Sequence, residues 1–275
     1  NRPESGKSSD ADRSSIDPEM LDYVSVFGER RDDPRIAGSA HFLDTEALER
    51  FEQNDVHKVL SRVPGVYVRG EDGFGLRPNI SMRGVDPNRS SKIVLLEDNV
   101  LLGPAPYSAP AAYYFPLITR MSGIEVFKGP AAIVTGPNTI GGAINFLTQP
   151  IPKGPEAYVD LAGGSDSFVK IHGRAGTGTD RWGFLAEVAH VQTAGFKDIV
   201  TNAETGFDRN DAETGFDRND IMLKGRITTN PRADVVHELS GKFGWGSEVS
   251  NETYVGLTDA DFAGGRLTLS GSALD

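Results

Sequence analysis

Strict alternation of apolar and polar residues is the clearest pattern in the second half of the chain. In residues 169–175, valine, isoleucine, glycine and alanine alternate with lysine, histidine and arginine. The same alternation recurs in residues 223–227 and 238–245, with aromatic residues near the ends. Because successive side chains of a strand point to opposite faces, each segment predicts a strand with one apolar and one charged face.

Two folds accommodate such strands. A water-soluble sandwich buries the apolar faces, whereas a membrane barrel turns them to lipid and points the charges into its lumen. The connections at 177–181 and 229–233 are short, whereas 193–220 and the stretch from Ser247 onward are long. Short turns on one side and long loops on the other favour the outer-membrane barrel, although the connection at 163–167 is short as well.

The first half of the chain has the pattern of a mixed domain. Asp44 predicts the start of a helix that continues to about Gln53, and Asp55 the start of a second helix that ends at Pro64. Short strands separated by glycine-rich turns are predicted at Val66–Arg69, Asn79–Arg83, Ile93–Glu97, Val100–Leu102, Ile124–Phe127 and Ala143–Thr148. Helices and strands in this mixture predict a small α+β domain.

Composition removes several classes of function. The 275 residues carry a net charge of −11, which argues against nucleic acid as a partner. Cysteine is absent, the five histidines lack metal-ligand spacing, and no nucleotide-binding or hydrolase motif occurs. No apolar run reaches eighteen residues, which excludes a transmembrane helix but not transmembrane strands. We therefore expect no catalytic residue, no resident metal and no cofactor.

Two pairs of motifs resemble a known family. Residues 59–68 read VLSRVPGVYV and are followed by ISMRG at 80–84. Residues 124–131 read IEVFKGPA and are followed by IGGAINFLT at 140–148. In order and separation they resemble the plug of TonB-dependent outer-membrane receptors, and the resemblance extends over residues 20–262. It implies an α+β plug domain followed by antiparallel transmembrane β-barrel strands that form an incomplete barrel.

The resemblance divides the chain into three parts. We expect a periplasmic arm at 1–35, the plug at 36–152 and the N-terminal part of the barrel at 153–275. Roughly five or six strands fit into the last part, whereas plug-filled barrels have about 22. Either the barrel continues beyond this sequence or the gene is interrupted, and an interrupted product would be a non-functional receptor fragment.

A narrower resemblance is to the ferric citrate receptors. It rests on the loop segments 83–92, 105–107 and 250–259. Asn99 and Lys128 depart from the family pattern, in which glycine and arginine are common at these positions. The departures leave the plug interpretation unchanged.

The resemblance also implies substrate-binding residues at the plug apex. These are Arg89, Lys92 and Tyr107. The two cations would bind the carboxylates of an iron chelate, which a guanidinium group does well through paired hydrogen bonds, and Tyr107 would line the same pocket. Alternatively, Arg89 and Lys92 are solvated or form salt bridges to the barrel wall, and Tyr107 packs among neighbouring prolines.

A short apolar run lies between the polar arm and the plug, where the family has its TonB box. Its residues are Tyr23, Val24, Ser25, Val26 and Phe27. Extended, β-prone segments of this kind add as a strand to the exposed sheet edge of a partner. The alternative is that the run forms the first strand of the plug itself.

The expected function is TonB-dependent uptake of a ferric chelate, ferric citrate first, across the bacterial outer membrane. The expected partners are TonB with its inner-membrane energising complex, the chelate and outer-membrane lipid. The plug and arm would face the periplasm, and iron would be cargo. The alternatives are a receptor for another siderophore, and a secreted β-rich adhesin or binding module with a soluble core.

One segment of the predicted long loop is duplicated. Residues 203–211 read AETGFDRND, and the same nine letters recur at 212–220. Two short units do not make a repeat fold, which needs longer units and at least three of them. We interpret them as a duplication in a loop that tolerates insertion.

Overall fold

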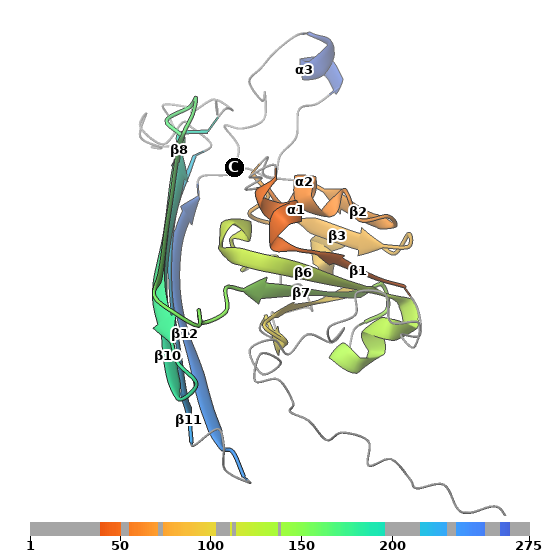
Figure 1. Cartoon of the computed structure of the whole chain (residues 1–275). Helices are drawn as coiled ribbons and strands as arrows, with labels where there is room; N and C mark the ends of the chain where they lie inside the picture. The colour runs from red at the N-terminus through yellow and green to blue at the C-terminus, as the bar shows by residue number, and fades with distance from the viewer. Residues whose placement is uncertain are drawn as a thin grey trace, which may run out of the picture.

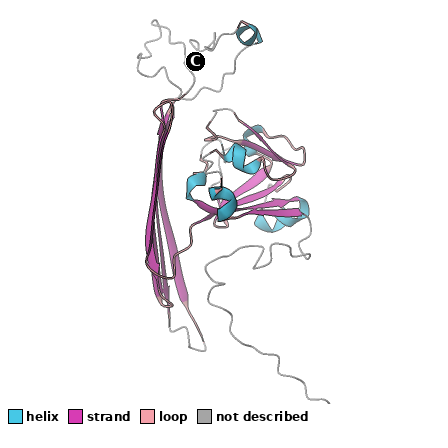
Figure 2. Ribbon diagram, turned by 45° about the horizontal axis from the view of Figure 1, so that its top comes forward, coloured by secondary structure: helices cyan, strands magenta, loops and turns pink. Residues whose placement is uncertain are grey.

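Two bodies of different architecture make up the described part of the chain. The computed structural model describes residues 39–50, 55–70, 74–102, 111, 114–136, 139–195, 215–229, 235–250 and 259–264. A mixed domain of strands and short helices lies beside a tall, curved sheet (Figure 1). Figure 2 shows that this second sheet contains strands alone, whereas helices and strands are interleaved in the first body.

A five-stranded sheet forms the centre of the mixed domain. In spatial order its strands are β1 (Ser39–Leu43), β6 (Met121–Lys128), β7 (Gly142–Thr148), β4 (Ile93–Glu97) and β5 (Val100–Leu101). The pairing of β4 with β7 is parallel, and all other neighbours are antiparallel. A separate hairpin consists of β2 (Val66–Arg69) and β3 (Asn79–Met82). These elements confirm the α+β class that the sequence predicted.

Two short helices precede the hairpin, α1 (Thr45–Glu49) and α2 (Val56–Leu60). Both begin after the predicted aspartates. The Asp44 side chain accepts a hydrogen bond from the backbone N–H three residues later at 2.9 Å, and Asp55 from the N–H two residues later at 2.8 Å. The first helix ends at Glu49, so the expected continuation to residue 53 was too long. In the ranges that the structure describes, no helix has the length and apolar character needed to cross a membrane.

The remaining helical elements are single turns or slightly longer. They are η2 (Asn88–Ser90), η5 (Ile118–Arg120), η6 (Gly129–Thr135) and α3 (Asp259–Ala263). The first three lie in the mixed domain, where they connect its strands, and α3 follows the tall sheet.

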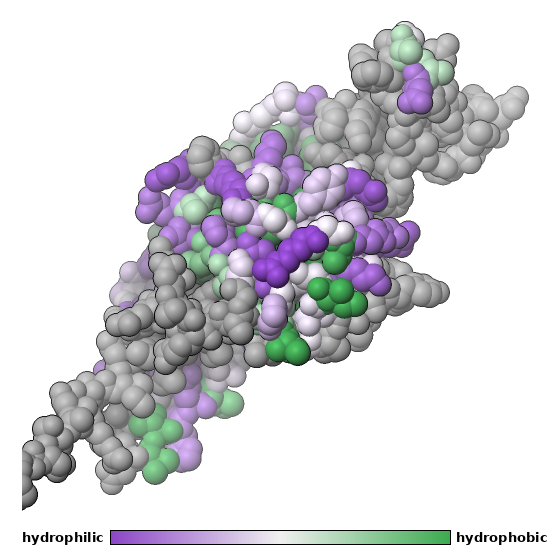
Figure 3. Space-filling view, turned by 90° about the vertical axis from the view of Figure 1, so that its right-hand side faces the viewer, coloured by the Kyte–Doolittle hydropathy of each residue, from purple (hydrophilic) through white to green (hydrophobic). Residues whose placement is uncertain are grey.

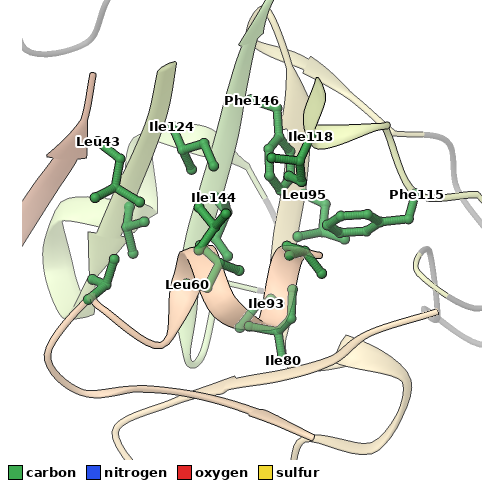
Figure 4. Packing of buried hydrophobic residues seen from close by; sticks show 14 of the residues in the cluster. Leu43, Leu60, Ile80, Ile93, Leu95, Phe115, Ile118, Ile124, Ile144 and Phe146 are labelled. Atoms are coloured by element: carbon green, nitrogen blue, oxygen red, sulfur yellow. The ribbon is translucent and has the colours of Figure 1, made fainter. Parts of the chain in front are cut away.

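The hydrophobic core lies between α2 and the central sheet. Val56, Val59, Leu60 and Val63, which the sequence places on one helical face, are all buried. They pack against apolar side chains from β3, β4, β6 and β7, several of which are shown in Figure 4. Burial of this face explains why so short a helix is stable, because a five-residue helix has little stability of its own.

A smaller cluster covers the opposite face of the sheet. Val94, Phe127 and Ala143 pack there against alanines of η6. Gly142 permits this close packing, because its φ is +151° and an added Cβ would meet the carbonyl oxygen of Phe127. Gly142 of the second motif therefore has a structural role.

The tall sheet is a meander of five antiparallel strands. In spatial order, which is also chain order, they are β8 (Glu156–Gly163), β9 (Val169–Gly178), β10 (Trp182–Thr193), β11 (Phe216–Thr228) and β12 (Glu238–Ser250). Every neighbouring pair is hydrogen-bonded without a register shift. This confirms the antiparallel barrel-type strands that followed the plug in the prediction.

Burial alternates along β8, β9, β10 and much of β11 in the sense opposite to that of a soluble protein, whereas β12 is exposed along nearly its whole length. Apolar residues on one face remain exposed, including Val159 (70%), Leu161 (69%) and Leu223 (48%). Charged residues on the other face are buried, including Lys170 (3%) and Glu187 (1%). Because the charged face is turned to the plug, these strands do not bury their apolar faces as a sandwich would.

Two predicted connections differ from the observed ones. The long connection was expected to reach residue 220, but β11 begins at Phe216, so the end of the duplicated segment is strand. The next turn was expected to end at residue 233, but β12 begins only at Glu238. A hydrogen bond from the Thr229 N–H to the His237 carbonyl, 2.9 Å long, closes this turn. The duplication thus overlaps a structural element.

We predict that deletion of residues 212–220 leaves β11 intact. The first copy would then precede Ile221 directly, and its arginine and second aspartate would take the inward positions of Arg218 and Asp220. The melting temperature of the protein in detergent should stay within experimental error of that of the parent. Deletion of residues 213–220 is the matched control, because an offset of one residue turns these charges to the outer face. Equal melting temperatures for both deletions would contradict the prediction.

Candidate functional site

The loop at residues 83–92, which contains the predicted ligands Arg89 and Lys92, has a hydrogen-bonded backbone, and these two residues are exposed. Arg89 adopts φ +51°, and its N–H donates a 2.7 Å hydrogen bond to Asn79 Oδ1. The buried Ser90 hydroxyl holds the same turn, accepting from the Ile80 N–H and donating to the Pro78 carbonyl, each at 2.9 Å. The side chain of Arg89 is exposed, with no ion-pair partner among the described residues.

Lys92 lies in the same loop and is exposed as well. Its carbonyl oxygen accepts a 2.8 Å hydrogen bond from the Gly141 N–H, which joins this loop to the segment before β7. Arg89 and Lys92 are therefore two exposed cations of the same loop. Tyr107 and the segment Tyr23–Phe27 lie outside the described residues.

The loop of Arg89 and Lys92 lies at the end of the plug sheet farther from the barrel strands. It joins the end of β3 to the start of β4, and the end of β6 and the start of β7 lie at the same end. The barrel strands contact the opposite end, through Glu97 and Arg120. The surface of the plug that faces away from those strands is largely hydrophilic, with scattered apolar side chains (Figure 3).

A buried arginine links the plug to the barrel. Arg120, the last residue of η5 directly before β6, is 4% exposed and donates from Nε to Asp220 Oδ2 of β11 at 3.1 Å. Its Nη2 lies 3.8 Å from Glu97 Oε2. Burial alone would lower the pKa of Arg120, but Glu97 and Asp220 outweigh it and raise the pKa above its ordinary value. The guanidinium is thus permanently charged between two carboxylates.

The ion pairs continue from Asp220 toward the next strand. Arg218 Nη2 lies 3.4 Å from Asp220 Oδ2, and its Nη1 donates to Glu248 Oε2 at 3.2 Å. Glu248 also pairs with Arg77 of the plug at 2.6 Å. Three arginines and two barrel carboxylates therefore form one chain of charges across the interface.

Two barrel lysines contact the turn between β4 and β5. Lys242 Nζ donates to Asp98 Oδ2 at 2.8 Å and pairs with Glu97. Lys224 Nζ lies 3.4 Å from the same Asp98 oxygen and donates to the Gln149 carbonyl at 2.8 Å. Burial raises the pKa of Asp98, but Lys224 and Lys242 outweigh it and hold the pKa below its ordinary value. Asp98 is therefore a carboxylate at neutral pH.

An apolar contact lies beside the charged one. Leu76 and Leu117 of the plug pack against Val191 and Phe216 of the barrel strands. Phe74 meets Phe216 edge to face, with ring centroids 5.1 Å apart. A cavity of about 300 Å³ adjoins this cluster and reaches Asp55 and Lys58 of the plug.

The barrel wall also contains polar pairs of its own. His172 Nε2 lies 2.7 Å from Glu187 Oε1, and Lys170 Nζ lies 2.6 Å from Asp160 Oδ2. Three of these side chains are buried on the sheet face that is turned to the plug: Lys170, His172 and Glu187. No cluster of acidic and histidine side chains able to hold a metal occurs within the described segments.

Sequence reasoning did not single out the interface residues. Lys224 and Lys242 were placed on the charged faces of their strands, but nothing indicated that Asp98 would lie between them. Arg120 carries a weak signal, because it is one of only two charged residues, with Glu125, in the largely apolar run 115–127. Its partner Asp220 is 100 residues away, beyond the reach of any local pattern.

A small mixed domain seated against strands that are charged inside and apolar outside has the architecture of a plugged membrane barrel. Comparison with known proteins agrees. Residues 34–143 match the sequence profile of the TonB-dependent Receptor Plug Domain family. Over these residues the chain is therefore similar to the plugs of TonB-dependent receptors, and the strands that follow are seated against this domain.

The relatives are transporters and receptors. The vitamin B12 transporter BtuB of Photobacterium profundum is 27% identical over 176 residues, which are 62% of this chain and 28% of the transporter. The unliganded ferric citrate transporter FecA has the same fold with a TM-score of 0.66 and 22% identity, covering 85% of this chain and 34% of FecA. The siderophore receptor PirA from Acinetobacter baumannii has a TM-score of 0.53 and 18% identity, covering 77% and 32%. This chain spans about a third of the length of these proteins.

We predict that the buried Arg120 stabilises the seating of the plug. Substitution Arg120→Ala removes this cation from Asp220 and Glu97, which keep Arg218 and Lys242, so the cost should be about 3 kcal/mol, at the lower end of the range for a broken buried ion pair. Chemical denaturation of the receptor in detergent should show this loss. The matched control is Arg50→Ala, which removes an exposed pair with Glu46 and should cost no more than about 1 kcal/mol. Equal effects of the two substitutions would refute the role of Arg120.

Proposed function

We propose that this chain is the plug and first barrel part of a TonB-dependent transporter that carries a ferric chelate, ferric citrate first, across the bacterial outer membrane. The observation that carries the proposal is the seating of a TonB-dependent receptor plug against strands whose opposite faces are apolar. Transport requires no covalent chemistry, so iron passes as cargo.

The strand faces support the membrane location. The exposed apolar side chains form the face that lipid would cover, and the charged side chains face the lumen that the plug fills. Trp182 and Phe184 stack at the start of β10, with ring centroids 6.3 Å apart. Exposed aromatic residues near strand ends suit the interfacial girdle of an outer-membrane barrel.

The connections support an orientation. The short turn 179–181 joins β9 to β10, whereas 194–215 joins β10 to β11 at the other end of the strands. Outer-membrane barrels place short turns in the periplasm and long loops outside. We therefore propose that the turn 179–181 faces the periplasm.

Coupling to TonB is proposed for the segment Tyr23–Phe27. Its β-prone composition suits strand addition to a partner. The first strand of the plug sheet in the described part of the chain is β1 (Ser39–Leu43), downstream of this segment. Rearrangement driven from the inner membrane would then displace part of the plug and open a path.

Arg89 and Lys92 are the proposed contacts to the chelate, together with Tyr107. The net charge of −11 repels an anionic ligand, so binding requires a local concentration of cations. The two exposed side chains provide it on a backbone that hydrogen bonds hold in place. Resemblance of this loop to ferric citrate receptors favours citrate.

Uptake of radioactive iron tests the function. The complete receptor should restore TonB-dependent uptake from ferric citrate to cells that lack their own receptors. If the receptor instead takes up iron from another siderophore, or vitamin B12, the proposed substrate is wrong and the proposed TonB-dependent transport still holds. Release of the receptor from membranes without detergent would favour a soluble adhesin.

We predict that Val24→Pro abolishes uptake and leaves chelate binding intact. Proline removes a backbone donor and prevents the segment from adding as a strand to TonB. Uptake and binding are measured on the same cells, and Ser25→Ala, which retains the backbone donor, is the control. Uptake at the parental rate would rule out the segment as the TonB box.

We predict that Arg89→Asn weakens binding of ferric citrate by about 1.5–3 kcal/mol, the worth of a charged hydrogen bond. Asparagine suits the left-handed backbone at φ +51°, so the loss is separated from strain. Arg89→Glu should bind more weakly still, because it adds repulsion. Calorimetric titration measures both, with Arg50→Asn as a control on an exposed helix. Parental affinity in both Arg89 variants would show that Arg89 does not bind the chelate.

A further inference from the structure

We propose that Lys224 and Lys242 form an anion-binding site on the inner barrel wall, which the Asp98 carboxylate of the plug occupies in the closed state. When the plug moves, a carboxylate of the passing chelate takes the place of Asp98. The inference deepens the proposed transport function and rests on it. Its ligand class is a compact polycarboxylate anion.

The two lysines lie opposite each other on neighbouring strands. Lys224 and Lys242 are directly opposite in the register of β11 and β12. Like charges directly opposite on one sheet face destabilise the pairing of the strands. In the parts of the barrel that the structure describes, no carboxylate forms an ion pair with either lysine; their acidic partners, Glu97 and Asp98, belong to the plug.

Asp98 occupies the position between the two lysines with a single carboxylate oxygen. Its Oδ2 lies 2.8 Å from Lys242 Nζ and 3.4 Å from Lys224 Nζ, so one carboxylate oxygen bridges both cations. A carboxylate of a ligand has the same charge and geometry. The pKa of Asp98 lies below its ordinary value, which keeps the group ionised.

The carboxylate is fixed to the plug. The Thr148 N–H donates to Asp98 Oδ1 at 2.9 Å, and the Thr148 hydroxyl donates to Oδ2 at 2.6 Å. Asp98 and Asn99 form the tight turn between β4 and β5, with φ of +48° and +66°. Because these bonds tie Asp98 to β7, a displacement of the plug sheet withdraws the carboxylate and leaves both lysines uncovered.

Space for a ligand already adjoins this position. A cavity of about 310 Å³ lies between the Asp98 turn and strands β11 and β12. Its lining includes Lys224, Lys242 and Arg226, together with the carboxylate of Glu238. This volume is at the lower end of the range for small-molecule sites, about 300–1,000 Å³, which suits a compact anion.

The position along the strands suggests a role in exit. Lys224 and Lys242 lie toward the ends of β11 and β12 that the connection 229–237 joins. The pair Arg77 and Glu248 lies toward the other ends. With the proposed orientation, the lysines are on the periplasmic half of the lumen, separate from the ligand loop of Arg89.

Bromide binding tests the site without reference to transport. Crystals of the complete receptor with Asp98→Asn, grown in sodium bromide, should show anomalous density between the two Nζ atoms. The parent should show none, because Asp98 holds the position, and Asp98→Asn with Lys242→Gln should show none either. Absence of density in Asp98→Asn would overturn the anion site.

Iron uptake from ferric citrate tests its use. The variant Lys224→Gln/Lys242→Gln should bind ferric citrate at the cell surface as the parent does. Its uptake should fall about tenfold, the scale of one lost charged hydrogen bond. The variant Glu97→Gln/Asp98→Asn removes the same plug–barrel ion pairs, and in addition the Glu97–Arg120 pair within the plug, but keeps both lysines, so its uptake should exceed that of the lysine variant by about tenfold.

Equal uptake by the two double variants would overturn the inference, since the lysines would then only hold the plug. Bromide density together with no TonB-dependent uptake by the parent would refute the proposed function and the role of the chelate. Normal parental uptake without bromide density in Asp98→Asn would refute the site alone. The two failures are therefore distinguishable.

Discussion

The buried contact of Arg120 with Asp220 and Glu97 determines how the plug is seated against the barrel strands. An unpaired charge in this position would be costly, so any plug orientation that separates these groups is strongly disfavoured. An apolar contact discriminates less between orientations of the plug, because the hydrophobic effect is not directional. The apolar cluster around Phe216 adds buried apolar area beside the ion pairs, whereas the ion pairs determine the orientation of the plug.

The same strands supply the charged inner face and the apolar outer face. Side chains alternate with a period of two, so Asp220 points to the plug and Ile221 to the outside. A register slip of one residue in β11 would exchange these faces and remove the partner of Arg120. The seating of the plug and the apolar exterior therefore depend on one strand register.

Local pattern predicted most of the plug and little of the interface. Strands β2 and β4 have the predicted bounds, because each is a short apolar run between turn residues. The edge strand β1 was missed, since its five residues acquire a strand partner only from β6, far along the chain. The partners of Arg120 could not be predicted for the same reason. The motif resemblance supplied what periodicity could not, namely that the apolar strand faces point outward.

The predicted ligand loop and the barrel lysines lie at opposite ends of one buried strand. β4 begins directly after Lys92 and ends at Glu97, next to Asp98. Between these points it is hydrogen-bonded to β7 along its length, and most of its side chains are buried. A close-packed strand of this kind shifts as a unit rather than deforming locally. Movement of the sheet at the ligand loop would therefore displace the carboxylates that cover Lys224 and Lys242, which gives the plug a short mechanical route from one end to the other.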